Sequence, residues 1–330
     1  MAATESIFSP TKTNFIHRKF ANYAKFSSSI AFFPYEVSRY SVSPERLQDI
    51  QDFIDLQGKN SKRTVLLLAH DYDRPMAKWL KGNPIVFRYS MSKIFDYRDE
   101  YIIPPKVDSF REAFDFRNVL PWSSTPKISF MGWSAFVCWS ENLENEKQEV
   151  LQKLKLKSSV KASPLIFPTP FNIGVILRKR AMDIIQSDPR IECNFSVNDR
   201  YFYQCDQPTQ NDKREKYMES IRDTHYVLTI RGSGNYSIRL FETLAAGRIP
   251  VMIDSNQHLP FEDLVPWKEL GVWMPFEKFE QIGDYIFEFH ENNGDRGFIT
   301  ATSRASQIFE KFLSRDATLV QIEKILERYI

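Results

Sequence analysis

The segment over residues 226–267 constrains the fold of this 330-residue chain more than any other part. An apolar run over 226–230 leads into a turn at 231–234 that contains two glycines. A helical pattern follows over 237–246, and a second apolar run follows over 248–253. This order of strand, helix and strand predicts two parallel strands joined by a right-handed crossover, so the chain has to contain a parallel sheet.

The turn at 231–234 is suited to bind an anion. Its glycines allow a close approach of a ligand, and the helix that follows offers unpaired N–H groups and the positive end of its dipole. Arg239 and Glu242 lie three residues apart and share one face of this helix. Arg239 can bind a phosphate, whereas a carboxylate at Glu242 repels phosphate and suits the two hydroxyls of a ribose. The pair predicts a nucleotide-sugar site; the alternative is a simple ion pair worth about 0.3–0.5 kcal/mol.

Other polar residues extend this predicted donor site. They are small or basic and lie beside the turn or on a helix expected over 173–186: Arg231, Gly232, Ser233, Ser237, Arg178 and Arg180. Ser237 either donates to the phosphate or caps the helix. Arg178 and Arg180 are candidates to neutralise a diphosphate leaving group, because without a metal a cationic group has to stabilise that charge. The alternative for both arginines is a solvated helix face.

Length and composition restrict the class of protein. A chain of 330 residues suits two domains of roughly 120–200 residues each. The net charge of +2 gives no electrostatic case for nucleic-acid binding. No apolar run approaches the ~18–20 residues that a membrane-spanning helix needs. Cys138, Cys193 and Cys205 fit neither a zinc pattern nor a disulfide framework, so we expect a reducing compartment.

Strand and helix patterns alternate along the chain and predict doubly wound α/β sheets. We expect residues 1–30 to form a partly ordered arm. Strands are expected at 65–69, 85–89, 101–103 and 127–132. Helices are expected from Ser43-Pro44 onward and at 140–157, 173–186, 214–222, 279–291, 303–314 and 318–330.

The segment from Arg231 to Trp267 resembles the C-terminal donor motif of the exostosin family, glycosyltransferase family 47. The matching positions have the spacings of that motif: Arg231-Gly232, Ile238-Arg239-Leu240-Phe241-Glu242, Ala245, Gly247, Pro250-Val251, Leu259-Pro260-Phe261 and Trp267. Weaker similarity lies upstream, at His70-Asp71, 101–105, 127–132 and 178–182. The chain departs from the family where Tyr72 replaces a usual glycine, and 134–170 matches no family feature.

The resemblance implies two Rossmann-like domains facing each other across a cleft, the arrangement called GT-B. Residues 1–125 would bind the acceptor, 126–300 would bind the donor, and helices in 301–330 would pack back toward the first domain. It also implies inverting transfer of a hexosyl or uronosyl group from a UDP-sugar to a glycan hydroxyl, with no obligatory metal. Family members pair with one another, so a homo- or heterodimer stays open.

An inverting transfer requires a base that accepts the proton of the attacking hydroxyl. His70 and Asp71 follow a predicted strand, where ligands of open α/β sheets bind, and either can serve; the alternative is a polar pair that orders a loop. Asp71-Tyr72-Asp73 imitates the metal-binding Asp-x-Asp motif of another glycosyltransferase architecture. Three residues are a weak pattern, and we expect no metal.

Two other functions stay open. The helix and following strand are also similar to fucosyltransferases that use GDP-fucose, through a related Glu-x-x-x-x-Gly-x-x-Pro-Val stretch. A non-catalytic glycan-binding or partner subunit would retain the same fold. Because the sequence contains no secretory signal or membrane anchor, we expect a bacterial-type cytoplasmic enzyme, peripheral to a membrane at most. The alternative is a Golgi enzyme whose anchor has been removed.

Overall fold

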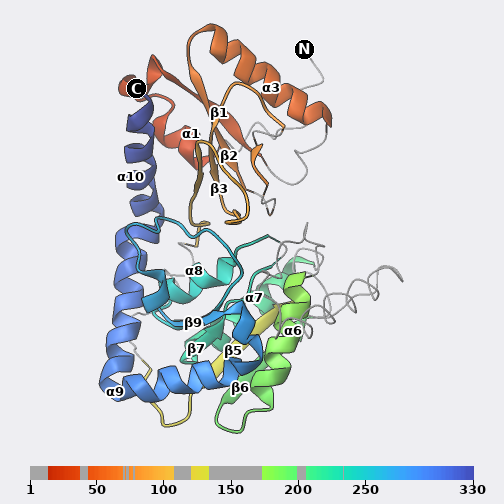
Figure 1. The fold of residues 1–330 in the computed structure, drawn as a ribbon, viewed down its shortest axis with the longest axis vertical. Coiled ribbons are helices and arrows are strands. Elements are labelled where there is room, and N and C mark those ends of the chain that lie inside the picture. The colour runs from red at the N-terminus through yellow and green to blue at the C-terminus, as the bar shows by residue number, and fades with distance from the viewer. Residues whose placement is uncertain are drawn as a thin grey trace. The chain divides into compact units, whose positions relative to one another are not determined.

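A computed structural model describes residues 14–37, 44–69, 71, 74–76, 79–107, 120–133, 173–198, 206–232 and 234–330. The predictions for His70, Ser233, Cys138, Cys205 and the segment 134–170 lie outside these residues. The chain divides into two compact units (Figure 1). Unit 1 comprises Met1–Pro105, Gln257–Phe261 and Arg315–Ile330, and unit 2 comprises Lys106–Asn256 and Glu262–Ser314.

Unit 1 contains a four-stranded parallel sheet in the order β1-β2-β3-β4. The strands are β1 (Ile30–Val37), β2 (Arg63–Leu68), β3 (Ile85–Arg88) and β4 (Glu100–Ile102). Both faces of the sheet are buried, which explains why the last four residues of β2 are all apolar. Val65 and Leu67 of β2 belong to one apolar cluster, and Leu66 and Leu68 belong to another.

Helices cover each face of this sheet. α1 (Phe15–Phe20), α2 (Ala24–Ser27) and α10 (Arg315–Leu326) share the cluster of Val65, and α3 (Pro44–Lys59) packs in the cluster of Leu66. The predicted arm over 1–30 is wrong from residue 14 onward. Asn14 caps α1 by accepting from the His17 N–H at 2.9 Å, and aromatic residues of α1 and α2 are buried in the core.

Unit 2 contains five parallel strands in the order β6-β5-β7-β8-β9. The strands are β5 (Lys127–Trp133), β6 (Glu192–Asn198), β7 (Tyr226–Leu228), β8 (Ile249–Asp254) and β9 (Val272–Pro275). α8 (Ile238–Ala245) connects β7 to β8, and these strands pair in parallel, which confirms the predicted strand–helix–strand unit. The predicted fold class, α/β with two parallel-sheet domains, is confirmed.

α6 (Ile173–Gln186) and α9 (Ile282–Ile308) pack on one face of this sheet. α7 (Gln207–Arg222) contacts β5, and α8 contacts β8. The helices predicted over 279–291 and 303–314 are replaced by the single element α9, which is kinked at Gly294, and by the π-helix η6 (Phe309–Leu313). Short 3-10 turns complete the described elements: η4 (Trp267–Glu269), η5 (Phe276–Gln281) and η7 (Glu327–Tyr329).

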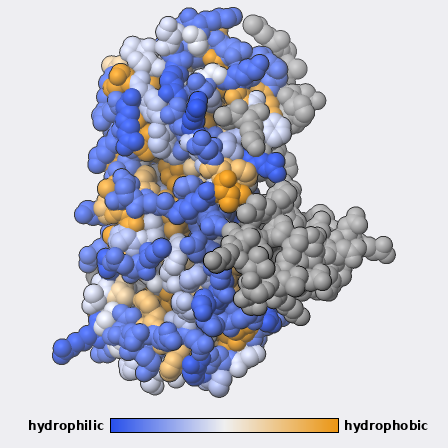
Figure 2. Space-filling model, viewed as in Figure 1, coloured by the Kyte–Doolittle hydropathy of each residue, from blue (hydrophilic) through white to orange (hydrophobic). Residues whose placement is uncertain are grey.

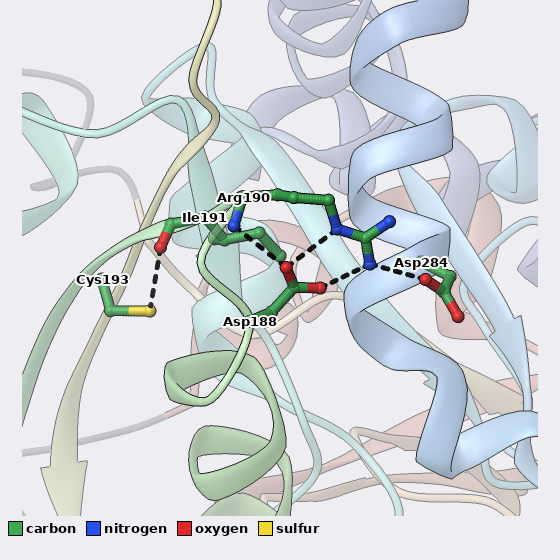
Figure 3. A network of polar contacts seen from close by, with 5 residues as sticks. All are labelled: Asp188, Arg190, Ile191, Cys193 and Asp284. Carbon is green, nitrogen blue, oxygen red and sulfur yellow. Dashed lines mark hydrogen bonds and ion pairs between the residues drawn. The ribbon is translucent and has the colours of Figure 1, made fainter.

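The turn between α6 and β6 is tied to the start of α9 by one arginine (Figure 3). Arg190 donates from Nε to Asp188 at 2.8 Å, and its Nη2 lies 2.6 Å from both Asp188 and Asp284. Arg190 and Asp284 are exposed and Asp188 is mostly buried, so solvent weakens the contact with Asp284 in particular. Cys193 lies beside them, and burial raises the pKa of its thiol to about 11.

The visible surface of the described residues is mostly hydrophilic, with small apolar areas between polar side chains (Figure 2). Among the helices that the structure describes, none combines the length and the apolar content that crossing a bilayer requires.

Candidate functional site

The strand order of unit 2 reverses between β5 and β7. From β5 the chain continues to β6 on one side, and it then returns to form β7 on the other side. In open parallel sheets, ligands bind beyond the carboxyl ends of the strands at such a switch point. The carboxyl end of β5 and the residues that follow β7 are therefore where sheet topology alone places a ligand. The candidate arginines can be compared with this position.

Arg239 lies at the carboxyl end of β5. Its Nη2 donates to Met131 O at 2.8 Å, and its guanidinium lies 4.4 Å from the ring centroid of Phe130. A Cβ on Gly132 would lie 2.7 Å from Nη2, so a glycine is needed for this approach. Arg239 is only 9% exposed, yet no carboxylate of the described residues lies within 4.0 Å of it, and its Nε has no hydrogen-bond partner there. A buried positive charge is unfavourable unless an anion pairs with it, so this position is suited to bind an anion.

Arg178 approaches the same place from α6. Its Nη1 donates to Trp133 O at 3.2 Å, and its Nε and Nη2 donate to Ile230 O at 3.3 and 3.2 Å. Its guanidinium carbon lies 5.6 Å from the Phe130 ring that Arg239 also contacts. Arg178 thus links the ends of β5 and β7, and it lies beside Gly232.

The glycine turn is held by its neighbours on both sides. Arg231 is buried and donates to Asn235 Oδ1 at 3.0 Å, and that oxygen also accepts from Ser255 Oγ at 2.7 Å. On the other side, a Cβ on Gly174 of α6 would lie 2.3 Å from Gly232 O. Because this contact is with backbone, a larger side chain at position 174 would displace either the helix or the turn. Arg231 and Gly232 are therefore held by neighbouring residues on both sides.

Ser237 occupies the N-cap position of α8 without capping it. Its backbone is extended, its hydroxyl makes no capping hydrogen bond, and Oγ is buried with no partner among the described residues. A serine at this position normally bonds to an N–H of the first turn. The hydroxyl is thus left for a ligand or water at the positive end of the helix dipole.

Glu242 is held by a residue of the preceding helix. Tyr217 of α7 donates from its hydroxyl to Glu242 Oε2 at 2.5 Å. Burial raises the pKa of Glu242, while the Tyr217 hydrogen bond and the charges of Arg239 and Arg214 act in the opposite direction. Burial and the nearby Glu242 charge raise the pKa of Tyr217 well above its usual value, so the tyrosine is the donor in this bond.

The simple ion pair between Arg239 and Glu242 does not form. In the described structure Arg239 binds the Met131 carbonyl, and Glu242 accepts from Tyr217. The two side chains lie three residues apart on α8 and bond to different groups, and Tyr217 lies against both of them. Arg239 and Glu242 therefore do not neutralise each other in a direct ion pair.

The remaining candidate residues are placed differently. Arg180 is not brought to this cluster: it pairs with Glu280 near the surface through two guanidinium nitrogens, Nε at 3.1 Å and Nη2. Asp71 lies in unit 1, three residues after the end of β2 and partly exposed. His70 and Ser233 lie outside the described residues.

Sequence reasoning overlooked three residues that shape this site. Tyr217 and Gly174 belong to helices whose packing the sequence does not reveal, and Gly132 was noticed only as part of a resemblance. A glycine in the first turn of a helix, as at position 174, disfavours that helix, which is the one feature that could have drawn attention to it.

Comparison with known proteins gives a family match that includes this site. Residues 178–287 match the family model described as Exostosin GT47 domain. Exostosin-1 of Drosophila melanogaster is 30% identical over 82 residues, which are 25% of this chain and 11% of that protein. A probable β-1,4-xylosyltransferase of Arabidopsis thaliana is 35% identical over 81 residues, covering 24% and 18%. A probable glucuronosyltransferase of Oryza sativa subsp. japonica is 33% identical over 93 residues, covering 28% and 21%.

Solved structures show a weaker likeness over more of the chain. A glycosyltransferase from Rickettsia africae ESF-5 has a TM-score of 0.41 at 12% identity, covering 88% of this chain and 83% of that one. The pneumococcal O-GlcNAc transferase GtfA, in complex with UDP and GlcNAc, has a TM-score of 0.38 at 10% identity, covering 92% and 57%. These TM-scores are too low to carry an argument.

The matched region contains all the arginines of the site together with Tyr217 and Glu242. The chain spans only about a tenth to a fifth of the length of the curated relatives described above. Residues 178–287 are therefore similar to an Exostosin GT47 domain.

Proposed function

We propose that the protein is a glycosyltransferase that transfers a sugar from a nucleotide-sugar, with UDP as the nucleotide, to a hydroxyl of a glycan acceptor. The observation that carries this proposal is the buried guanidinium of Arg239, which lies at the switch point of the sheet without a carboxylate within 4.0 Å in the described structure. A diphosphate is an anion of suitable size that binds at such a place. The matched exostosin domain supports sugar transfer as the reaction.

The donor diphosphate would contact the residues around the glycine turn. Arg239 and Arg178 supply positive charge from α8 and α6, and the Ser237 hydroxyl supplies a donor at the start of α8. As the bond to the sugar breaks, negative charge grows on the leaving diphosphate. These fixed charges and dipoles stabilise it without reorganisation. Arg180 has no part in this proposal because it pairs with Glu280.

Glu242 would accept hydrogen bonds from the ribose hydroxyls of the donor. Its Oε2 already accepts from Tyr217, whereas Oε1 has no hydrogen bond among the described contacts. In unit 1, Asp71 or His70 would take the proton of the acceptor hydroxyl as the new bond forms. The relatives named as a probable xylosyltransferase and a probable glucuronosyltransferase support a sugar donor but do not define which sugar this chain uses.

The test is calorimetric titration of the whole chain with UDP, GDP and their common sugar conjugates, with and without EDTA. We expect UDP to bind in the micromolar range, unaffected by EDTA, and to be lost in Glu242→Ala. Glu280→Ala is the matched control, because it removes an exposed carboxylate of the same unit and should bind like the parent.

Each other result has a defined meaning. Preference for GDP would replace this proposal with the fucosyltransferase alternative. UDP binding without turnover of any donor across an acceptor panel would support a non-catalytic subunit. No nucleotide binding at all, or equal binding by Glu242→Ala, would overturn the assignment of this site.

A further inference from the structure

We propose that Tyr217 is a positioning residue of the donor site, which holds the Glu242 carboxylate in place so that one of its oxygens faces the ribose. This inference rests on the proposed function, because it assigns a role toward the same donor. Tyr217 lies outside the motif of α8, on the preceding helix α7.

The geometry of the contact supports a positioning role. The Tyr217 hydroxyl lies 2.5 Å from Oε2, at the short end for a hydrogen bond to a charged acceptor. A glutamate side chain has three rotatable bonds, and ordering it costs conformational entropy on binding. With Oε2 engaged by a residue of another helix, the carboxylate is already ordered before the ligand arrives. Oε1 is then the oxygen available to a diol.

The same tyrosine also lies against the phosphate-binding arginine. The guanidinium of Arg239 lies 5.5 Å from the ring centroid of Tyr217. Tyr217 thus contacts both residues that the donor would need. Phenylalanine at this position would keep the ring and its contact with Arg239, and it would remove only the hydroxyl.

Loss of the hydroxyl has a consequence that depends on pH. The charged and titratable groups that act on Glu242 in the described structure are Tyr217 and Arg214 from α7 and Arg239 from α8. Burial raises the pKa of Glu242, and the Tyr217 hydrogen bond opposes that rise. Without the hydroxyl the pKa of Glu242 is therefore higher, so the carboxylate becomes protonated at a higher pH. A protonated carboxyl accepts fewer hydrogen bonds from a diol.

The experiment is titration with UDP of the parent chain, Tyr217→Phe, Glu242→Gln and the control Tyr226→Phe, at several pH values between 5 and 8. Tyr226→Phe is matched because it removes another buried hydroxyl of unit 2, one that lies 3.0 Å from His290 Nδ1. We expect Tyr217→Phe to bind UDP about tenfold more weakly at pH 7, as for one hydrogen bond to a charged group. The pH at which affinity is half lost should also move upward.

The other variants define the comparison. Glu242→Gln should bind UDP weakly and should lack the acid limb of the profile, which is the loss of affinity as the pH falls. Tyr226→Phe should retain the parent's affinity and pH profile. Circular dichroism and the thermal midpoint Tm establish that each variant is folded. If Tyr217→Phe does not fold, replacing Tyr217 with 3-fluorotyrosine keeps the ring and strengthens the donor, and the acid limb should then move to lower pH.

The outcomes separate this inference from the proposed function. Loss of binding in Glu242→Gln, with Tyr217→Phe equal to the parent at every pH, would overturn the role of Tyr217 and leave the donor site standing. Weaker binding by Tyr217→Phe with an unmoved acid limb would also overturn it, because packing alone would explain that result. A parent chain that binds no nucleotide would overturn both.

Discussion

Arg88 and Glu100 form an ion pair in the interior of unit 1, with side chains 0% and 1% exposed. Glu100 also accepts from the Met76 N–H at 2.6 Å, and Arg88 donates to Arg74 O at 3.0 Å. The pair therefore links β3 and β4 to the segment after β2. That segment includes Arg74 and Met76, which lie close in sequence to Asp71, the candidate base.

Glu100→Gln should lower the free energy of unfolding by about 3–5 kcal/mol, because it takes the carboxylate away from a buried guanidinium. Urea unfolding followed by circular dichroism measures this. The double variant Arg88→Met/Glu100→Leu should cost much less, since it removes both charges. A loss of less than about 1 kcal/mol in the free energy of unfolding for Glu100→Gln would show that the ion pair does not hold β3 and β4 to the segment after β2.

For single residues, the sequence predicted the helix on which a residue lies better than it predicted the residues that it contacts. The spacing of Arg239 and Glu242 placed both on α8, as the structure shows. It could not reveal Tyr217, because only tertiary packing brings α7 against α8. It also could not show that Arg178 lies at the site while Arg180 lies near the surface. Residues two apart on a helix point in different directions, and only the position of Glu280 shows which one turns outward.

Gly294 interrupts the helix α9 with a φ of +53° and a ψ of −163°. Few residues other than glycine adopt this conformation, and nothing lies within 4 Å of a Cβ placed there. Gly294→Ala should therefore lower the free energy of unfolding by about 1–3 kcal/mol through backbone strain alone.

The matched control is Gly58→Ala in α3, where a Cβ also meets nothing within 4 Å. Gly58 lies in a helix, so alanine there should stabilise unit 1 by about 0.5–1 kcal/mol. Thermal unfolding of both variants measures the two effects. Equal changes in Tm would contradict the backbone origin of the kink.

Elements were predictable where apolar residues recur at a regular spacing. The helix over 173–186 has such a pattern, and β2 was predictable because its apolar residues form one continuous run. β6 alternates partly buried and exposed residues at the edge of its sheet and has no apolar run, which explains why it was overlooked. α7 was predicted too short, although Asp206 and a proline in the first turn mark its start.

Two buried histidines should make the stability of the whole molecule depend on pH. Nδ1 of His225 accepts from Lys127 N–H at 3.2 Å, and Nε2 donates to Pro121 O at 3.0 Å. His290 lies between Ser123 O, at 2.6 Å, and the Tyr226 hydroxyl. Burial lowers the pKa of both rings, and a proton on His225 Nδ1 would face the Lys127 N–H.

The folded-state pKa of each histidine is therefore below the value of about 6.5 in an unfolded chain. Below that pH the unfolded chain binds more protons, so the free energy of unfolding should fall as the pH decreases from about 7 to 5. Each histidine contributes at most about 1.4 kcal/mol per pH unit. Urea unfolding across this range should be flatter for His225→Gln than for the parent. His258→Gln in unit 1 is the control, and an equally flattened profile there would contradict the assignment.

At the scale of the whole chain, the sequence predicted two parallel α/β units because apolar strands alternate with helices in both halves. It could not show which helices complete which core. Leu319 and Ile322 of α10 pack in the same cluster as Val65, and nothing in a local pattern links segments so far apart in sequence.

α10 lies far along the sequence from the sheet that it covers, and this has a consequence while the chain is synthesised on the ribosome. A ribosome adds roughly 5–20 residues per second. The strands of unit 1 therefore emerge on the order of tens of seconds before residues 315–326, which complete their apolar cluster. During that interval unit 2 can close its own core, and the first sheet of the nascent chain keeps part of one apolar face uncovered, because α1 and α2 alone cover that face until α10 is made. That face is the surface on which a chaperone would act.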